Sequence, residues 1–420
     1  MIENTKIAII GLGFVGLPLA ILFAGKGYKV YGFDVDPQKI QMLNEGTSYI
    51  TDVSNFEIQT LHKQYGFEAS LPSSKIQEVA YIIVTVPTPF DEEKMKPDLT
   101  ALVTASKYIA EHLASNQTVI FESSTYPGTL EEVVLPILTT SGLTVGKDFF
   151  LGYSPERIDP GNLTLTVEQI PKVVSGLTHT CKTKVHEFYS TVFQKTVPVS
   201  SPKVAEMTKL FENIQRLINI SLVNELQLIC EKMGIDFREA IDAASTKPFG
   251  FTPYYPGPGI GGHCIPVDPL YFQWKASHYG QSSKLIQSAH KINQSIPLEI
   301  INKINSKLAN QPNNRSVLLL GLTYKKNIAD LRESPAMVIF KKLVESSIDV
   351  QYHDPFIPTV NINDKIYHSM PLTTQTIKSA NIIVVLTDHT SIDWQFVSDH
   401  AQNIIDTRGV IRNRLDKGVS

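Results

Sequence analysis

The chain has 420 residues, a formal net charge of −3, 42% hydrophobic residues and 19% charged residues. This length exceeds what one compact core usually supports, so it predicts two or three domains. The near-zero charge leaves no broad basic field, which argues against nucleic acid or an anionic membrane surface as the main partner.

The cysteine content and the apolar runs bear on the cellular compartment. Three cysteines are too few for a disulfide framework in a chain of this size. The N-terminal apolar run at residues 7–10 passes directly into a glycine turn, which is typical of a strand and not of a signal peptide. No apolar stretch has the length of a membrane span. We therefore expect a cytoplasmic protein with no membrane partner.

The first part of the chain alternates short apolar strands with amphipathic helices. Strands are predicted over Lys6–Ile10, Lys29–Phe33, residues 81–86 and Thr118–Phe121. Helices are predicted between them, for example over residues 17–23 and 102–113. This alternation predicts a parallel sheet with helices on its faces.

A glycine-rich turn follows the first predicted strand and opens a helix. Gly11, Gly13 and Gly16 have the spacing in which the first makes a tight turn, the second lets backbone approach a pyrophosphate and the third lets helix and strand pack. Asp34, at the end of the second strand, is placed to accept a hydrogen bond from a ribose 2′-OH, which favours NAD over NADP. A structural turn with a solvated aspartate is the alternative. The predicted cofactor site also includes Phe14 and Val15 of the same turn.

Hydroxyl side chains follow the third and fourth strands, in the segments 86–89 and 122–125. Ligands of open α/β sheets bind beyond the carboxyl ends of the strands. Thr88 and Ser124 are therefore predicted to lie on the nicotinamide side of the cofactor. Ordinary turn chemistry is the alternative for both.

A long helix is predicted from Pro202 to the residue before Gly234, because apolar residues recur every three or four positions. Such a helix usually bridges domains or builds an oligomer interface. Lys209 and Asn213 lie four residues apart, on one face of it. A role at the site competes with a simpler interpretation, a solvated lysine and an interhelical asparagine.

Residues 247–269 break all periodicity and are rich in glycine, proline and aromatics, which predicts an irregular functional segment. Cys264 ends a run of glycines and is not expected to pack like a core cysteine. A thiolate is the reactive form of cysteine. Asp268 would lie on the same side as Cys264 if one helical turn joined them. His263 has no CxxC or HxxxH companion, so no metal is expected.

Two further features complete the candidate chemistry. Glu156 and Arg157 follow an apolar run and offer a base and a phosphate-binding guanidinium, with a surface ion pair as the alternative. Cys230 lies on an apolar helix face and is predicted to be buried.

The C-terminal part repeats the design of the first. Strands are predicted over Ser316–Leu320, Asp349–His353 and residues 381–386 and 403–405. The predicted fold class is α/β, with two Rossmann-like, doubly wound parallel-sheet domains joined by a long helix and a helical central domain. We expect domains at residues 1–200, 201–300 and 301–420, with two nucleotide ligands facing each other across a cleft.

Taken together, these motifs resemble the UDP-glucose/GDP-mannose dehydrogenase family over nearly the whole chain, and most closely its UDP-N-acetylglucosamine 6-dehydrogenases. The matching segments are residues 11–18, 86–89, 122–128, 153–158, 209 with 213, 256–269 and 325–334. The resemblance implies a four-electron oxidation of a sugar C6 alcohol by two NAD. It proceeds through a thiohemiacetal and a thioester on Cys264, which water hydrolyses.

The resemblance also assigns roles to the matching positions. Asp268 and Lys209 activate water and steady the oxyanion. Asn213 holds the oxyanion, Thr125 orients water and Glu156 assists hydrolysis. Arg332 is expected near the cofactor, and the UDP-sugar is expected to contact Arg157, Gly261, Lys325 and Arg408. The second α/β domain lacks the three-glycine motif, which suits a UDP half.

The chain departs from the UDP-glucose branch at residues 247–251, where that branch carries an arginine supplied by a neighbouring subunit. His263 and the Pro-Gly-Pro-Gly run instead resemble the N-acetylhexosamine branch. Glucose is thereby disfavoured, while UDP-GlcNAc, UDP-GalNAc and UDP-ManNAc stay open. A two-electron β-hydroxyacid-type dehydrogenase and a non-catalytic nucleotide-binding protein are the other hypotheses. We expect a homodimer or higher homo-oligomer.

Overall fold

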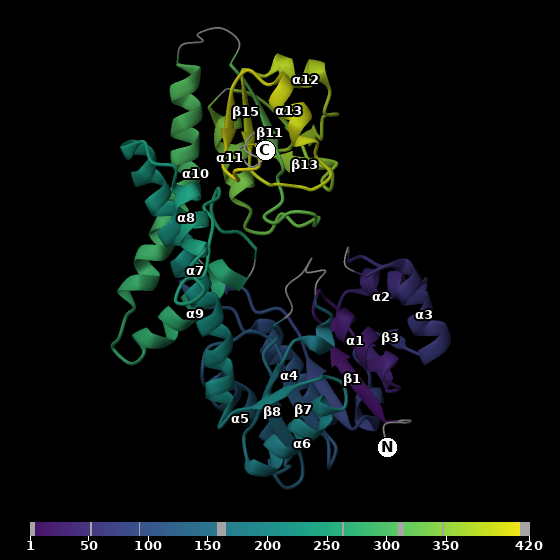
Figure 1. Ribbon diagram of the computed structural model, residues 1–420. Helices are drawn as coiled ribbons and strands as arrows, with labels where there is room; N and C mark the ends of the chain where they lie inside the picture. The colour runs from purple at the N-terminus through teal and green to yellow at the C-terminus, as the bar shows by residue number, and fades with distance from the viewer. Residues whose placement is uncertain are drawn as a thin grey trace. The chain divides into compact units, whose positions relative to one another are not determined.

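The computed structural model describes residues 5–50, 53–91, 93–157, 165–262, 264–309, 315–346 and 348–411. The chain forms two compact units. Unit 1 comprises Met1–Glu212 and Leu270–Ser282, and unit 2 comprises Asn213–Pro269 and Ser283–Ser420. Each unit contains a largely parallel sheet with helices on both faces (Figure 1). The predicted α/β class with two Rossmann-like sheets and a helical central region is confirmed.

The sheet of unit 1 has the strand order β10-β9-β8-β7-β4-β1-β2-β3. Its strands are β1 Lys6–Ile10, β2 Lys29–Phe33, β3 Glu68–Ser70, β4 Tyr81–Val84, β7 Thr118–Phe121, β8 Phe150–Tyr153, β9 Lys172–Gly176 and β10 Thr196–Pro198. Strands β8 and β9 are antiparallel, and the other neighbouring pairs are parallel. The order reverses between β1 and β4, which is where a doubly wound sheet opens its ligand crevice.

Helices cover both faces of this sheet. One core cluster joins the strands to α1 Gly16–Gly25, α3 Asn55–Tyr65 and α6 His179–Ser190. Within it the rings of Phe23 and Phe188 stack with centroids 5.0 Å apart. The opposite cluster holds α4 Thr100–His112 and α5 Leu135–Leu138, with a π-helical turn at Leu130–Val134. Smaller elements are α2 Pro37–Asn44 and the hairpin of β5 Phe90–Asp91 with β6 Lys96–Pro97.

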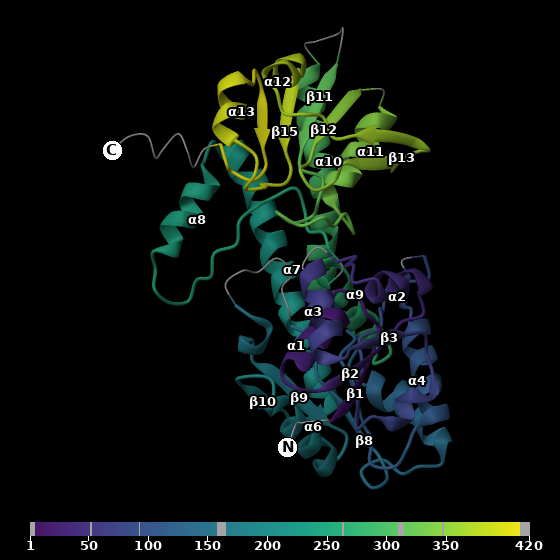
Figure 2. The same ribbon diagram turned by 90° about the vertical axis from the view of Figure 1, so that its right-hand side faces the viewer.

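Helix α7 spans Pro202–Met233 and ends at Gly234, whose φ of +70° suits a glycine stop. The predicted long helix is confirmed. The helical part of unit 2 continues with α8 Phe237–Ser245 and α10 Lys284–Leu308. Figure 2 shows α8 and the chain after it extending away from the rest of unit 2.

The sheet of unit 2 has the order β12-β11-β15-β16, and its pairs are parallel. Its strands are β11 Ser316–Leu320, β12 Asp349–His353, β15 Ile382–Val385 and β16 Ile404–Asp406. One face packs against α10 and α11 Pro335–Glu345, the other against α12 Thr374–Ser379 and α13 Trp394–His400 (Figure 2). A hairpin of β13 Thr359–Ile362 and β14 Lys365–His368 completes the unit.

Three sequence expectations need correction. The irregular segment ends earlier than residue 269, because α9 Cys264–Ser277 begins at Cys264. Pro266 occupies the first turn, where a missing N–H costs little, and Pro269 is tolerated inside the helix. The strand predicted at 81–86 ends at Val84. Cys230 is half-buried, and not fully buried as its apolar helix face predicted.

Candidate active site

The glycine turn after β1 separates structural from binding requirements. Gly11 has a φ of +91° and donates its N–H to Phe33 O at 2.8 Å. A Cβ on Gly16 would lie 1.9 Å from Gly11 O, so the third glycine is needed for α1 to start where it does. A Cβ on Gly13 would meet no atom within 4 Å. The second glycine therefore faces open space, as the approach of a dinucleotide pyrophosphate requires.

Asp34 is fixed at the end of β2. Its carboxylate accepts the N–H of Leu12 at 2.9 Å and that of Asp36 at 3.0 Å. The ammonium of Lys39 lies 3.6 Å away. Each carboxylate oxygen has a second lone pair, so the group can still accept ribose hydroxyls. Phe14 is exposed and Val15 half-buried on the same turn. These residues fit a bound NAD.

The structure brings together the hydroxyl residues that follow β4 and β7. Thr88 Oγ1 donates to Ser124 O at 2.6 Å. Tyr271, in α9, donates its hydroxyl to Thr88 O. The Thr125 hydroxyl is buried and has no hydrogen-bond partner among the described residues. Leaving such a group unpaired costs about 1–3 kcal/mol, which points to a water or ligand as its partner.

Glu156 and Arg157 do not pair with each other. Arg157 contacts Glu212 at 2.6 Å and donates to Pro171 O at 2.7 Å. The Glu156 carboxylate lies 3.5 Å from the ammonium of Lys172. The two neighbours therefore have separate partners, and Glu156 belongs to a buried group of charges.

On α7, Lys209 and Asn213 are both buried, so a solvated Lys209 is excluded. Asn213 Nδ2 donates to Asp268 Oδ2 at 2.6 Å, and Asp268 is itself 2% exposed. Asp268 lies one turn after Cys264 in α9, as the four-residue spacing predicted. The structure thus joins two of the predicted catalytic residues within unit 2.

Cys264 is exposed at the first turn of α9. The unpaired N–H groups of a first helical turn favour negative charge on a nearby sulfur. The loop before it is held by backbone N–H bonds to side chains and to one carbonyl. Its bonds are Gly257 N to Asn224 Oδ1 at 2.9 Å, Ile260 N to Asn293 Oδ1 at 2.6 Å and Gly262 N to Arg332 O at 3.0 Å. The thiol is therefore presented on a rigid support. His263 lies outside the described residues.

Gly261 lies where the loop passes closest to the C-terminal sheet domain. A Cβ on it would lie 2.6 Å from both Glu333 O and Tyr324 Cβ. Because backbone cannot yield as a side chain does, this position excludes larger residues. Gly261 thereby fixes the loop, and its predicted contact with substrate is a separate matter.

The predicted phosphate-binding cations follow strands of unit 2. Arg332 donates to both oxygens of Asp330, with Nη2 to Oδ2 at 2.6 Å. That pairing raises the pKa of Arg332, and negative charge on Cys264 adds to the effect. Arg408 donates Nε to Leu386 O at 2.8 Å, and burial lowers its pKa. Lys325 is half-buried after β11. The carboxyl ends of parallel strands share one edge, which suits a common anion.

Comparison with known protein families decides the assignment. Residues 5–193, 203–295 and 318–413 match the NAD-binding, central and UDP-binding domains of the UDP-glucose/GDP-mannose dehydrogenase family. The chain belongs to this family. It is therefore an NAD-dependent dehydrogenase of UDP-sugars.

Individual relatives narrow the likeness to enzymes of N-acetylated sugars. The chain is 40% identical to UDP-N-acetyl-D-glucosamine 6-dehydrogenase of Pseudomonas aeruginosa over 360 residues, 84% of either chain. It is 31% identical to UDP-N-acetyl-D-mannosamine dehydrogenase of Methanocaldococcus jannaschii, covering 98% of this chain and 93% of that one. A UDP-D-ManNAc dehydrogenase structure from Pyrococcus horikoshii superposes with a TM-score of 0.87 at 28% identity, covering 97% of this chain and 96% of that one.

The UDP-binding domain of this dehydrogenase repeats the turn of the NAD-binding domain with one difference. Gly321 donates its N–H to His353 O at 2.9 Å, and Leu322 N donates to Asp354 Oδ2 at 2.6 Å. Asp354, however, is 2% exposed and is contacted by the buried ring of His389 at 3.2 Å. Its carboxylate is closed off from a ribose, which agrees with a domain that does not bind a second dinucleotide.

Sequence reasoning missed several buried groups that support this site. Glu206 of α7 caps the π-helical turn of unit 1, accepting from Gly128 N at 2.6 Å and Leu130 N at 3.0 Å. Burial raises its pKa to about 7. Lys172 was read only as the edge of a strand. A charged residue inside an apolar pattern was the one available signal for both.

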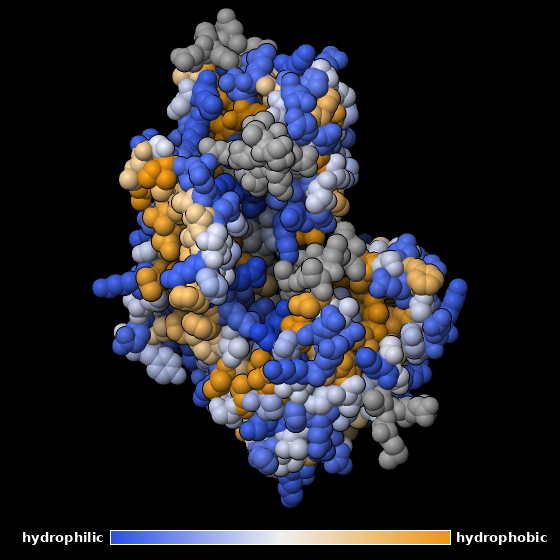
Figure 3. Space-filling view, viewed as in Figure 1, coloured by the Kyte–Doolittle hydropathy of each residue, from blue (hydrophilic) through white to orange (hydrophobic). Residues whose placement is uncertain are grey.

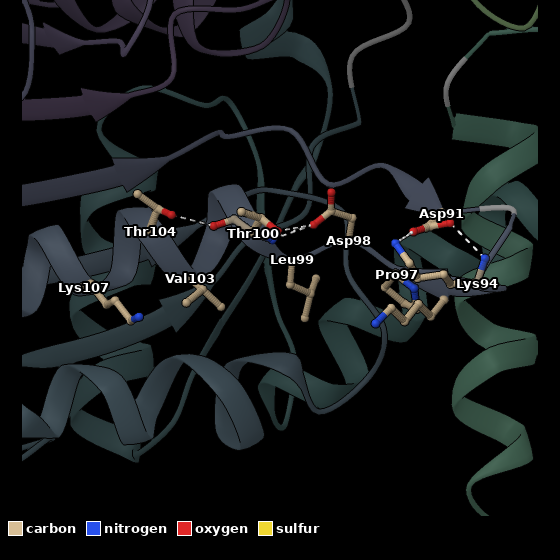
Figure 4. Close-up of a pocket in the computed structure, with 10 residues that line it drawn as sticks. Asp91, Lys94, Pro97, Asp98, Leu99, Thr100, Val103, Thr104 and Lys107 are labelled. Carbon is tan, nitrogen blue, oxygen red and sulfur yellow. Dashed lines mark hydrogen bonds and ion pairs between the residues drawn. The ribbon is translucent and has the colours of Figure 1, made fainter.

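Other features of the dehydrogenase lie apart from the predicted residues. A hollow of about 520 Å³ beside the β5–β6 hairpin and the start of α4 contains none of them (Figure 4). Its charges pair locally, as in the 2.8 Å contact of Lys94 with Asp91. Among the described residues, no group of three His, Cys, Asp or Glu side chains could hold a metal. Within the same ranges, no helix is long and apolar enough to cross a membrane.

Proposed function

We propose that the chain oxidises the C6 hydroxyl of UDP-N-acetylglucosamine to the carboxylate, with Cys264 as covalent nucleophile. The observation that carries the proposal is the exposed Cys264 at the start of α9, one helical turn before the buried Asp268–Asn213 pair. A packed or distant thiol could not serve as a nucleophile. Bound NAD accepts the hydrides that leave C6.

The first task of the side chains is to capture the C6 aldehyde. The sulfur of Cys264 forms a bond to the carbonyl carbon, and the carbonyl electron pair moves to oxygen. The Asn213 amide keeps a second N–H beyond the one given to Asp268, and can donate it to that oxygen. Lys209 supplies positive charge for the same oxyanion.

Loss of a second hydride leaves a thioester on Cys264, which water must hydrolyse. The buried hydroxyl of Thr125 orients the water, since it lacks a partner among the described residues. Asp268 and Glu156 are the carboxylates that accept protons during this step. UDP binds through Lys325, Arg408 and Arg157, together with the backbone at Gly261. Arg332 serves the cofactor side.

The choice of sugar rests on similarity. Identity is 40% to the P. aeruginosa UDP-GlcNAc enzyme and 31% to the M. jannaschii UDP-ManNAc enzyme, which favours UDP-GlcNAc. UDP-ManNAc is the second candidate, supported by the TM-score of 0.87 to the P. horikoshii structure. We further propose a cytoplasmic role in polysaccharide precursor synthesis, with domains at residues 1–200, 201–300 and 301–420.

A substrate panel tests the proposal directly. Purified enzyme is mixed with NAD and each of UDP-GlcNAc, UDP-ManNAc, UDP-GalNAc, UDP-glucose and GDP-mannose, and NADH is followed by absorbance. Two NADH per UDP-GlcNAc are expected. One NADH per substrate would indicate a two-electron dehydrogenase of the β-hydroxyacid type. Tight NAD binding without turnover on any sugar would indicate a non-catalytic binding protein.

A homodimer is proposed from the surface of α7. Its exposed apolar residues are spaced so that they form one stripe along the helix: Val204, Phe211, Leu222, Ile229 and Met233. Hydrophobic side chains also gather over the helical part of unit 2 (Figure 3). Such a patch is unusual on a monomer and typical of a subunit interface.

Breaking this stripe is expected to separate the subunits. Leu222→Glu places a charge at the centre of the stripe, and burying an unpaired charge in an interface is costly. We expect the oligomer to dissociate to monomers in light scattering, while circular dichroism keeps its wild-type form. Glu225→Gln on the same helix is the matched control and should leave the mass unchanged. A Leu222→Glu variant that keeps the wild-type mass would locate the interface elsewhere.

A further inference from the structure

Lys172 is buried between two carboxylates beyond the carboxyl ends of β7 and β8. Its ammonium lies 2.6 Å from Glu122 and 3.5 Å from Glu156, and its side chain is 4% exposed. Tyr189 of α6 donates its hydroxyl to the other oxygen of Glu122. The ammonium also lies 5.3 Å from the ring centre of Tyr189. Strands β7 and β9, the chain after β8 and helix α6 thus converge on one set of charges.

Such a cluster is an expensive way to build a core. Burying charges costs more than their mutual attraction returns unless further hydrogen bonds support them, and apolar residues often pack as stably. The pKa of Glu122 is raised to about 7 by burial, with Lys172 opposing the rise and Glu156 adding to it. Burial acts to lower the pKa of Lys172, but Glu122 and Glu156 together outweigh it and raise that pKa. Clusters of this kind concentrate at functional sites.

The three charged groups differ in their access to solvent. The side chains of Glu122 and Lys172 are closed off, at 0% and 4% exposed, whereas that of Glu156 is 12% exposed. Glu156 is also the member placed in the chemistry by the proposed function. Arg157, next in the chain, is directed to Glu212 and Pro171 instead. The contact between the interior charges and Glu156 therefore runs through Lys172.

We propose that Lys172, anchored by Glu122 and Tyr189, is a positioning residue that holds Glu156 as a fixed, ionised carboxylate for thioester hydrolysis. This inference rests on the proposed function. Lys172 reaches no reacting atom in the proposed chemistry and acts through Glu156.

The step that depends on this arrangement balances without any further reagent. Water forms a bond from its oxygen to the thioester carbon, and the carbon–sulfur bond breaks with its electron pair staying on Cys264. One proton of the water passes to Glu156. The other passes from the new carboxylic acid to the thiolate sulfur, leaving the uronate. A carboxylate that is rotated away or protonated cannot take the first proton, so hydrolysis slows while capture of the aldehyde does not.

A pair of variants separates positioning from folding. Lys172→Met removes the cation but leaves Glu122 buried and unpaired, so it also destabilises the fold. Lys172→Met combined with Glu122→Gln removes both buried charges and restores thermal stability. In both variants we expect kcat for uronate to fall about 100-fold with KM for UDP-GlcNAc within about threefold. The acyl-enzyme should accumulate after a rapid burst of two NADH per site, visible in the intact mass of quenched protein.

Matched variants close the remaining routes. Lys172→Arg keeps the charge and should recover part of kcat. Lys75→Met breaks an exposed ion pair with Glu68 in the same unit and should leave the kinetics unchanged. If the double variant does not fold, Tyr189→Phe removes a single hydroxyl and should still show a longer-lived acyl-enzyme.

The outcomes that overturn the inference are distinct from those that overturn the function. Wild-type kcat in the stable double variant would show that Lys172 is purely structural. So would a fall in kcat that follows thermal stability across all variants with no acyl-enzyme. Wild-type protein that yields no second NADH from any UDP-sugar would instead contradict the proposed function.

Discussion

The variant Cys264→Ala is expected to lose uronate formation by about a thousandfold or more, because alanine offers no nucleophile to capture the C6 aldehyde. The side chain is exposed. Its removal should therefore change the free energy of unfolding by less than about 0.5 kcal/mol. NAD and UDP-GlcNAc should still bind with near wild-type Kd. The measurement is the yield of uronate by mass spectrometry beside the NADH count.

Cys230→Ala is the matched control, since Cys230 is half-buried on α7 and has no proposed role. It should keep full turnover with two NADH per sugar. A Cys264→Ala enzyme that makes uronate at the wild-type rate would remove the thioester from the mechanism, although the glycine turn and the fold assignment would stand. Release of free aldehyde by this variant would instead support capture by the sulfur as the second stage.

Local patterns predicted much of the fold because each strand carries its own signal. Runs such as Lys6–Ile10 and Ser316–Leu320 are apolar, short and followed by glycine, and the structure has strands with these bounds. The end of the irregular segment was misjudged because prolines at 266 and 269 mark breaks in a sequence, while a first helical turn accepts proline readily. The order of strands, and β8 to β10 at the sheet edge, depends on pairing between distant segments.

The candidate site divides along the same line. Cys264, Asp268, Lys209 and Asn213 could be selected from spacing alone, because residues four apart share one side of a helix. The contact of Asn213 with Asp268 joins positions 55 residues apart and is visible only in the structure. Lys172 and Glu122 are 50 residues apart, and neither signals its partner in the sequence. Buried charge networks are therefore the part of an active site that sequence reasoning reaches last.

The second large effect is expected at the glycine turn, where Gly13→Ala should weaken NAD binding without disturbing the fold. A Cβ at this position meets no protein atom within 4 Å, so the thermal midpoint should stay at its wild-type value. The same methyl would occupy the space proposed for the pyrophosphate. Overpacking of this kind costs about 1–3 kcal/mol, which corresponds to a rise in Kd for NAD of about 5- to 150-fold. Titration calorimetry with NAD measures the change.

Two other glycines make this result interpretable. Gly16→Ala would force its Cβ to 1.9 Å from Gly11 O, so it should lower stability and NAD affinity together. Gly25→Ala, at the end of α1, meets no atom within 4 Å and should change neither. Loss of NAD affinity at Gly13 alone would separate a steric requirement of the ligand from one of the protein. Unchanged affinity in Gly13→Ala would mean that the pyrophosphate does not lie against this turn, whatever the spacing of its glycines.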